Sequence, residues 1–119
     1  MKDFRQLKVW EEAHAITLAV YRAADLFPKH ELYGLTNQIQ RAAASIPTNI
    51  TEGCGKKSDA EFRHYLTIAM GSSSELEYLL LLTHDLGYLT DEKYLELSTN
   101  LVITRKMLNA LIQKLKANR

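Results

Sequence analysis

The sequence predicts an all-α protein that folds as an antiparallel, up-down-up-down four-helix bundle. Four segments repeat apolar residues every three or four positions, and no segment of useful length alternates with a period of two. The 119 residues include only 5 glycines and 2 prolines, too few for the frequent turns of a β-sandwich or barrel. Because short connections make neighbouring helices antiparallel, we expect one domain over residues 1–119 with left-handed helix packing.

The first two predicted helices span residues 8–27 and 32–52, and each carries one apolar stripe. Pro28 ends the first helix because it disfavours helical geometry in the residue before it. Pro47 predicts a kink or a local break in the second helix, and the glycines of the 53–55 segment predict a left-handed cap after it. The stripes are Val9, Ala13, Ile16, Val20, Ala24 and Phe27, then Leu32, Leu35, Ile39, Ala42, Ile46 and Ile50.

The third and fourth predicted helices span residues 58–86 and 91–117. The third begins with the capping box Ser58-Asp-Ala-Glu61 and ends before Gly87. The fourth follows Thr90, an N-cap residue, and opens with two acidic residues that suit the positive end of the helix dipole. The third stripe has heptad spacing. The two stripes are Phe62, Leu66, Ala69, Ser73, Leu76, Leu80 and Thr83, then Tyr94, Leu97, Leu101, Thr104, Leu108, Leu111, Ile112 and Leu115.

The third helix carries more apolar residues than one core-facing stripe requires. Residues 79–82 are four consecutive leucines, which cover most of the circumference of a helix. A helix that is apolar nearly all round has a second packing partner. We interpret the excess, which includes Tyr78 and Leu82, as a subunit interface. The alternative is an unusually wide stripe that faces the core.

A polar stripe runs along the second helix beside its apolar stripe. It fits either a polar active groove or a network that fixes the register between helices or subunits. We favour the network, because the 71–74 segment is Gly-Ser-Ser-Ser and such small side chains allow close helix approach. An ion pair between Arg41 and Glu75 is geometrically reasonable. The predicted members of the network are Gln38, Arg41, Ser45, Asn49, Glu52, Ser72 and Glu75.

The sequence indicates no catalytic residues, no metal site and no cofactor, and therefore no enzyme. The four histidines lack the spacing of metal ligands, and no histidine is adjacent in sequence to the one cysteine, Cys54, to act as its base. A single cysteine also excludes an internal disulfide. The N-terminus lacks a signal-peptide pattern, and no stretch is apolar enough to span a membrane. We therefore expect a cytoplasmic protein.

The net charge of +1 hides an uneven distribution of charge. The N-terminal segment, the turn between the second and third helices, and the C-terminus are predicted to share one end, which we call the basic end. It holds nine basic and six acidic side chains, a net charge of +3, whereas the opposite end holds three and eight, a net charge of −5. The basic residues either complement helix dipoles or, repeated around a ring of subunits, bind phosphate backbones. They are Lys2, Arg5, Lys8, Lys56, Lys57, Arg63, Lys114, Lys116 and Arg119.

Several short motifs occur together in this chain. They are Phe4-Arg-Gln-Leu7-Lys-Val-Trp10, Gly34-Leu35, Gln38, Arg41-Ala-Ala43, Ser45-Ile-Pro47, Asn49-Ile50, Glu52-Gly53, Gly71-Ser72, Glu75-Leu76 and Leu86-Gly-Tyr-Leu89. With these motifs the whole chain resembles the four-helix bundle proteins encoded in intervening sequences of bacterial 23S ribosomal RNA genes. That family is similar to the accessory protein of diversity-generating retroelements, a basic barrel that binds nucleic acid and a reverse transcriptase.

The resemblance implies a four-helix bundle that assembles into a homopentameric ring. Although the family carries an old ribosomal-protein label, the label does not imply ribosome membership. We predict a non-enzymatic oligomer that binds RNA or DNA through its basic end without base specificity. The alternative is a protein-interaction scaffold or adapter ring that binds no nucleic acid and uses the acidic end or the outer face of the third helix.

Overall fold

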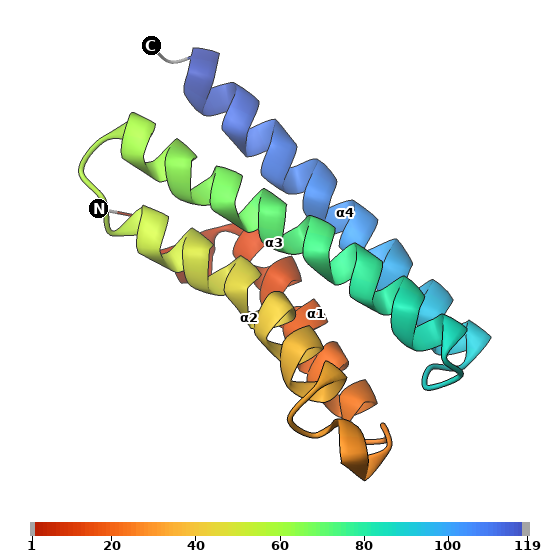
Figure 1. Cartoon of the computed structure of the whole chain (residues 1–119). Helices are drawn as coiled ribbons and strands as arrows, with labels where there is room; N and C mark the ends of the chain where they lie inside the picture. The colour runs from red at the N-terminus through yellow and green to blue at the C-terminus, as the bar shows by residue number, and fades with distance from the viewer. Residues whose placement is uncertain (1, 118–119) are drawn as a thin grey trace.

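The computed structural model describes residues 2–117, which contain four long α-helices and no strand (Figure 1). The helices are α1 (Lys8–Ala24), α2 (Leu35–Cys54), α3 (Asp59–Asp85) and α4 (Asp91–Ala117). Two short 3₁₀ turns, η1 (Phe4–Gln6) and η2 (Lys29–Glu31), precede α1 and α2. The predicted all-α class is confirmed.

Consecutive helices run in opposite directions, and each helix packs against two others. α1 and α3 both contact α2 and α4, so the four helices enclose one core. The molecule measures 47 × 24 × 20 Å. Figure 1 shows the N-terminal segment, the α2–α3 turn and the C-terminal part of α4 at one end, with the other two connections at the opposite end. The predicted four-helix bundle is therefore confirmed.

The predicted apolar stripes form the hydrophobic core. Every residue of the first and third stripes is buried, including the polar Ser73 and Thr83. The fourth stripe is buried except for Tyr94 and Leu111, which are half-buried. The heptad pattern of α3 therefore predicts its inner face residue by residue, because a helix rotated about its axis would expose part of the stripe.

The run of leucines in α3 divides between the core and the surface. Leu79 and Leu80 are buried, whereas Tyr78 and Leu81 are 59% and 43% exposed. Leu82 is half-buried. Part of the apolar excess of α3 thus remains uncovered within a single chain.

α1 ends at Ala24 and not at the predicted Phe27. The backbone N–H groups of Leu26 and Phe27 donate to the carbonyl groups three residues earlier, at 3.2 and 3.1 Å, so the chain tightens into a turn. Pro28 keeps Phe27 from helical angles, and the turn between Ala24 and Pro28 replaces the last predicted residues of the helix. Phe27 still reaches the core, where it is buried.

α2 is displaced toward the C-terminus, to residues 35–54 from the predicted 32–52. Leu32, predicted in its apolar stripe, lies in the preceding turn and is 54% exposed. The predicted left-handed cap is wrong at this helix end, because Gly55 has a right-handed φ of −82°. The left-handed glycine predicted after α3 is confirmed, with Gly87 at φ +81°.

The helix around Pro47 is continuous, so the predicted local break is absent. A proline at this position deprives the carbonyl of Ala43 of its usual N–H donor. The hydroxyl of Thr17 on α1 lies 3.1 Å from that carbonyl oxygen and 2.7 Å from the carbonyl oxygen of Ala13 in its own helix. Thr17, Ala43 and Pro47 are all buried. A side chain of α1 thus satisfies the carbonyl that Pro47 leaves open.

We expect Thr17→Val to lower the free energy of unfolding by about 1–2 kcal/mol, because it leaves the buried Ala43 carbonyl without a donor. In a Pro47→Ala background the cost should fall, since residue 47 then has an N–H for that carbonyl. Chemical denaturation of the unchanged protein, the two single variants and the double variant measures how far the two substitutions depend on each other. Thr104→Val is a matched control, because the Thr104 hydroxyl donates only to Asn100 in its own helix, at 3.0 Å. Equal costs in both backgrounds would contradict the role of Thr17.

A hydrogen bond joins the α1–α2 and α3–α4 connections. The hydroxyl of Tyr88 donates to Glu31 Oε2 at 2.9 Å, and the ring of Tyr88 packs on that of Phe27 with centroids 5.5 Å apart. The other carboxylate oxygen of Glu31 accepts the N–H of Leu35 at 3.3 Å. The bond from Tyr88, followed by that from Leu35, lowers the pKa of Glu31. One carboxylate therefore both ties the two connections together and caps the start of α2.

We expect Tyr88→Phe to reduce stability at about pH 7 and to have a smaller effect near pH 3. Because the folded-state pKa of Glu31 is lower than its pKa in the unfolded chain, the ionised carboxylate stabilises the fold above the ordinary glutamate range. This contribution is lost as the pH falls through the folded-state pKa. Urea denaturation of both chains at the two pH values measures the difference. A pH-independent effect of the substitution would contradict this role of Glu31.

Candidate functional site

The fold brings eight of the nine predicted basic residues to one end of the bundle. Lys2, Arg5 and Lys8 precede or open α1, Lys56 and Lys57 form the α2–α3 turn, and Arg63, Lys114 and Lys116 belong to α3 and α4. All of these side chains are exposed except Arg63, which is half-buried. Arg119 lies outside the described residues.

One backbone hydrogen bond joins the N-terminal segment to the end of α2, and local bonds order each of the two segments. The N–H of Lys2 donates to the carbonyl of Cys54 at 3.3 Å, and Asp3 accepts the N–H of Arg5 at 3.0 Å. Ser58 is confirmed as the N-cap of α3, since its Oγ accepts the N–H of Glu61 at 3.1 Å. The Glu61 carboxylate accepts the hydroxyl of Ser58 at 3.1 Å, in place of the backbone N–H that a capping box would use. The bond from Lys2 brings this residue beside Lys56 and Lys57, and all three line one small pocket.

Three of the basic side chains lie on aromatic rings. Lys2 Nζ is 5.8 Å from the centroid of Phe62, and Lys56 Nζ is 5.2 Å from that of Tyr65. Arg5 lies 4.6 Å from the centroid of its neighbour Phe4 and also 3.6 Å from the carboxylate of Asp3. Rings attract cations without neutralising them. These lysines therefore keep their charge for an external anion.

The other basic side chains of this end differ in their exposure and in their contacts within the chain. Lys8, Lys57, Lys114 and Lys116 are exposed and make no ion pair within residues 2–117. Arg63 Nη1 is buried without a hydrogen-bond partner among those residues. The four lysines are the most available cations of the basic end, and Arg63 is the least available.

The predicted polar network divides into a bonded and an unbonded part. Ser45 on α2 and Ser72 on α3 share a hydrogen bond of 2.7 Å, and Asn49 Nδ2 donates to the carbonyl and hydroxyl oxygens of Ser45 at 2.8 and 3.0 Å. The other four side chains are exposed and form no hydrogen bond to another side chain or to the backbone within residues 2–117. They are those of Gln38, Arg41, Glu52 and Glu75. The ion pair expected between Arg41 and Glu75 is not formed.

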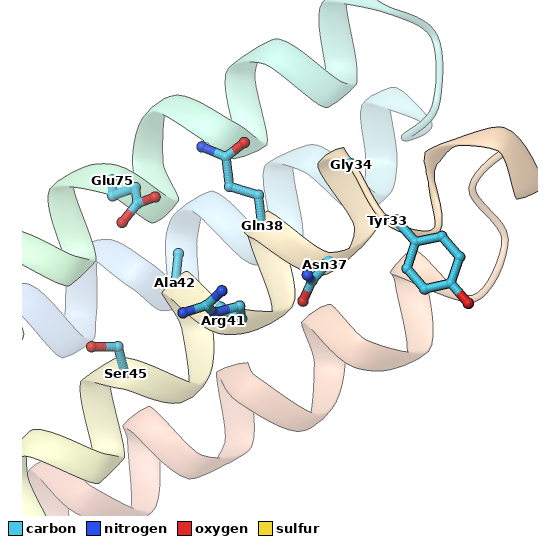
Figure 2. A pocket seen from close by; sticks show the side chains of 8 residues that line it. All are labelled: Tyr33, Gly34, Asn37, Gln38, Arg41, Ala42, Ser45 and Glu75. Carbon is cyan, nitrogen blue, oxygen red and sulfur yellow. The ribbon is translucent and has the colours of Figure 1, made fainter.

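Three of the unbonded polar residues, Gln38, Arg41 and Glu75, line a cleft of about 490 Å³ between α2 and α3 (Figure 2). Arg41 from α2 and Glu75 from α3 both line it, and Ser45 lies farther along α2, beyond Arg41. Tyr33, at the other end of the cleft, is 91% exposed. The whole lining is Tyr33, Gly34, Asn37, Gln38, Arg41, Ala42, Ser45 and Glu75. We call this surface the α2–α3 cleft.

Two histidine contacts were not predicted. Trp10 stacks on His14 with centroids 4.9 Å apart, beside an apolar groove of about 430 Å³ between α1 and α2. His84 Nε2 lies 2.6 Å from Asp91 Oδ1, and the ring stacks on Tyr94 at 4.4 Å. The spacing of four between Trp10 and His14 signals such a contact on a helix. His84 contacts Asp91 and Tyr94, which belong to α4, and the apolar periodicity of a single helix does not predict such a contact.

The one thiol of the chain, at Cys54, is buried. Burial raises the pKa of the Cys54 thiol, and the charge of Lys2 opposes this effect more weakly. A thiol in such surroundings is less nucleophilic than an activated one. Within residues 2–117 no three metal-ligating side chains converge, and none of the helices there is long and apolar enough to cross a bilayer.

The fold and sequence are similar to those of other proteins. A crystal structure from Bacteroides thetaiotaomicron VPI-5482, of a protein with unknown function from the S23 ribosomal protein family, superposes with a TM-score of 0.81. It is 27% identical over 87% of this chain and 97% of its own. No curated protein matches the chain. The family model of the 23S rRNA-intervening sequence protein matches residues 5–110, which span all four helices. As the motifs predict, this chain belongs to the 23S rRNA-intervening sequence protein family.

Proposed function

We propose that this protein is a non-enzymatic, oligomeric four-helix bundle that binds the backbone of RNA or DNA through its basic end. The observation that carries the proposal is the convergence of Lys8, Lys57, Lys114 and Lys116. These four exposed lysines come from distant parts of the sequence and have no acidic partner within residues 2–117. Lysine side chains of this kind contact phosphates, and such contacts carry no sequence information.

Assembly would multiply a charge that is modest in one chain. A net charge of +3 at one end is weak for a nucleic-acid site. The homopentameric ring implied by the family resemblance would place five such ends around one rim. A rim of this kind holds a polyanion through several simultaneous contacts, and its affinity depends steeply on salt.

The alternative function is a protein scaffold that binds no nucleic acid. It is favoured by the exposure of Tyr78 and Leu81 on α3, since exposed apolar patches mark protein contacts. The acidic end of the bundle offers a second surface for a basic partner. A pull-down from native lysate that returns only the protein itself would count against this function.

We expect labelled structured RNA and duplex DNA to bind in a fluorescence-anisotropy titration at low salt, and to bind more weakly at physiological salt. The slope of log K against log salt counts the phosphate contacts, at roughly 0.9 for each contact on a duplex. Replacement of Lys56, Lys57, Lys114 and Lys116 by Glu should abolish binding.

A matched control removes the same charge elsewhere in the chain. Replacement of Arg22, Lys29, Lys93 and Lys106 by Glu changes the net charge equally but leaves the basic end intact. This variant should still bind RNA and DNA in a salt-dependent way, although its lower net charge weakens the long-range attraction. Equal loss in both variants, or no binding at low salt by the unchanged protein, would contradict the proposal.

A further inference from the structure

An apolar groove of about 430 Å³ lies between α1 and α2. Three aromatic rings line it, those of Phe4 in η1 and of Trp10 and His14 on α1. From α2 the lining includes Pro47, whose ring is also flat, and the exposed Thr48. The volume lies in the range of clefts that enclose small ligands, roughly 300–1,000 Å³. We call this surface the α1–α2 groove.

The rings of the α1–α2 groove form a row of successive contacts that begins at a cation. The guanidinium carbon of Arg5 lies 4.6 Å from the centroid of Phe4. The centroids of Phe4 and Trp10 are 5.0 Å apart, and those of Trp10 and His14 are 4.9 Å apart with the two planes at 12°. Aromatic rings beside a guanidinium are the surfaces on which proteins pack unpaired nucleobases.

The polar groups of the α1–α2 groove suit an uncharged ring and not a phosphate. The hydroxyls of Thr17 and Thr51, which line it, donate to backbone carbonyls at 2.7 and 2.9 Å. Glu52 also lines the groove, where it is exposed and forms no hydrogen bond within residues 2–117. Its carboxylate repels a phosphate but does not repel a neutral base.

The α1–α2 groove adjoins the basic end, where the phosphates of a bound strand would lie. Arg5 directly follows the groove residue Phe4, and Lys56 and Lys57 come just after the last turn of α2, which contributes Glu52. Figure 1 shows the N-terminal segment and the α2–α3 turn at the same end of the bundle. Cations beside an apolar groove match a nucleotide, which combines a phosphate with a flat, uncharged ring, better than they match an apolar protein segment.

We propose that the α1–α2 groove holds an unpaired base of the RNA or DNA that the basic end binds. The base packs against Trp10, while the phosphates next to it lie on the lysines of the basic end. This inference rests on the proposed function and names its substrate class, which is single-stranded nucleic acid. A base inside a duplex is paired and stacked, so it does not reach the groove. Sequence selectivity stays low, because every base has a π-face.

Trp10 is the one tryptophan of the chain, so its fluorescence reports on the α1–α2 groove directly. A single-stranded oligonucleotide without self-complementary sequence should quench this fluorescence, because a base packs against the indole. A strand of the same length in which every nucleotide is abasic has the same number of phosphates but should leave the fluorescence unchanged. In a fluorescence-anisotropy titration at equal salt, the abasic strand should bind about fivefold or more weakly.

Replacement of the rings tests the groove from the side of the protein. Trp10→Leu removes the indole but keeps an apolar side chain, and should weaken binding of the base-containing strand by about fivefold or more. It should leave the affinity for the abasic strand unchanged. His14→Leu, at an exposed position of the same groove, is a second variant and should act in the same direction.

Tyr33→Leu is the matched control for the two ring variants. Tyr33 is an aromatic residue that is 91% exposed, and it lies in the α1–α2 connection, at the opposite end of the bundle (Figure 1). Its replacement should change the affinity for neither strand. Circular dichroism confirms that every variant stays folded.

The outcomes separate this inference from the proposed function. Equal affinity for the two strands, with no change in tryptophan fluorescence, would overturn the base site but leave a protein that binds phosphate backbones. Equal weakening of both strands by Trp10→Leu would also overturn the base site, because the indole would then act only through the fold. Failure of every strand to bind at low salt would overturn the proposed function and this inference together.

Discussion

The burial of the heptad stripe of α3 is the constraint on which the other contacts depend. Leu66, Ala69, Ser73 and Leu76 are completely buried at its centre, where α3 packs against α2 and α4. Such burial fixes the rotation of α3 about its own axis. If the helix rotated, it would expose apolar side chains and bury polar ones.

The fixed rotation of α3 then determines which neighbouring helix each of its other faces contacts. Ser72 is directed to α2, where it bonds to Ser45 at 2.7 Å. Ser74 and Glu77 are directed to α4, where Arg105 donates to them at 3.2 and 2.9 Å. The side of α3 that carries Ile68, Glu75 and Tyr78 is what remains, so its exposure follows from the same packing that builds the core.

Polar groups inside the bundle are satisfied almost entirely by backbone carbonyls. The hydroxyls of Ser73, Thr83 and Thr104 each donate to a carbonyl three or four residues earlier in their own helix. Among the buried hydroxyls of residues 2–117, that of Thr17 also reaches a different helix, at the carbonyl left open by Pro47. Buried polar groups lose stability when they lack partners, so this contact lets a proline occupy the middle of α2 without a break.

The helix directions explain why positive charge collects at one end. α2 and α4 both finish there, and lysines at or beyond their last turns complement the negative ends of their dipoles. α3 begins there with Asp59 and Glu61, which complement its positive end. Three of the four lysines of the proposed phosphate contact lie at or beyond these helix ends, namely Lys57, Lys114 and Lys116, whereas Lys8 opens α1. The two roles are compatible because the side chains remain exposed.

Local patterns in the sequence were enough to predict the four helices, their inner faces, the N-cap at Ser58 and the left-handed glycine at position 87. Each depends on residues within a few positions of one another, so spacing and residue type contain the information. The end of α1, the start of α2, the continuity of α2 through Pro47 and the separation of Arg41 from Glu75 depended on the folded chain. They are decided by contacts between residues far apart in sequence, such as Thr17 with Ala43 and Tyr88 with Glu31, which no periodic pattern reports.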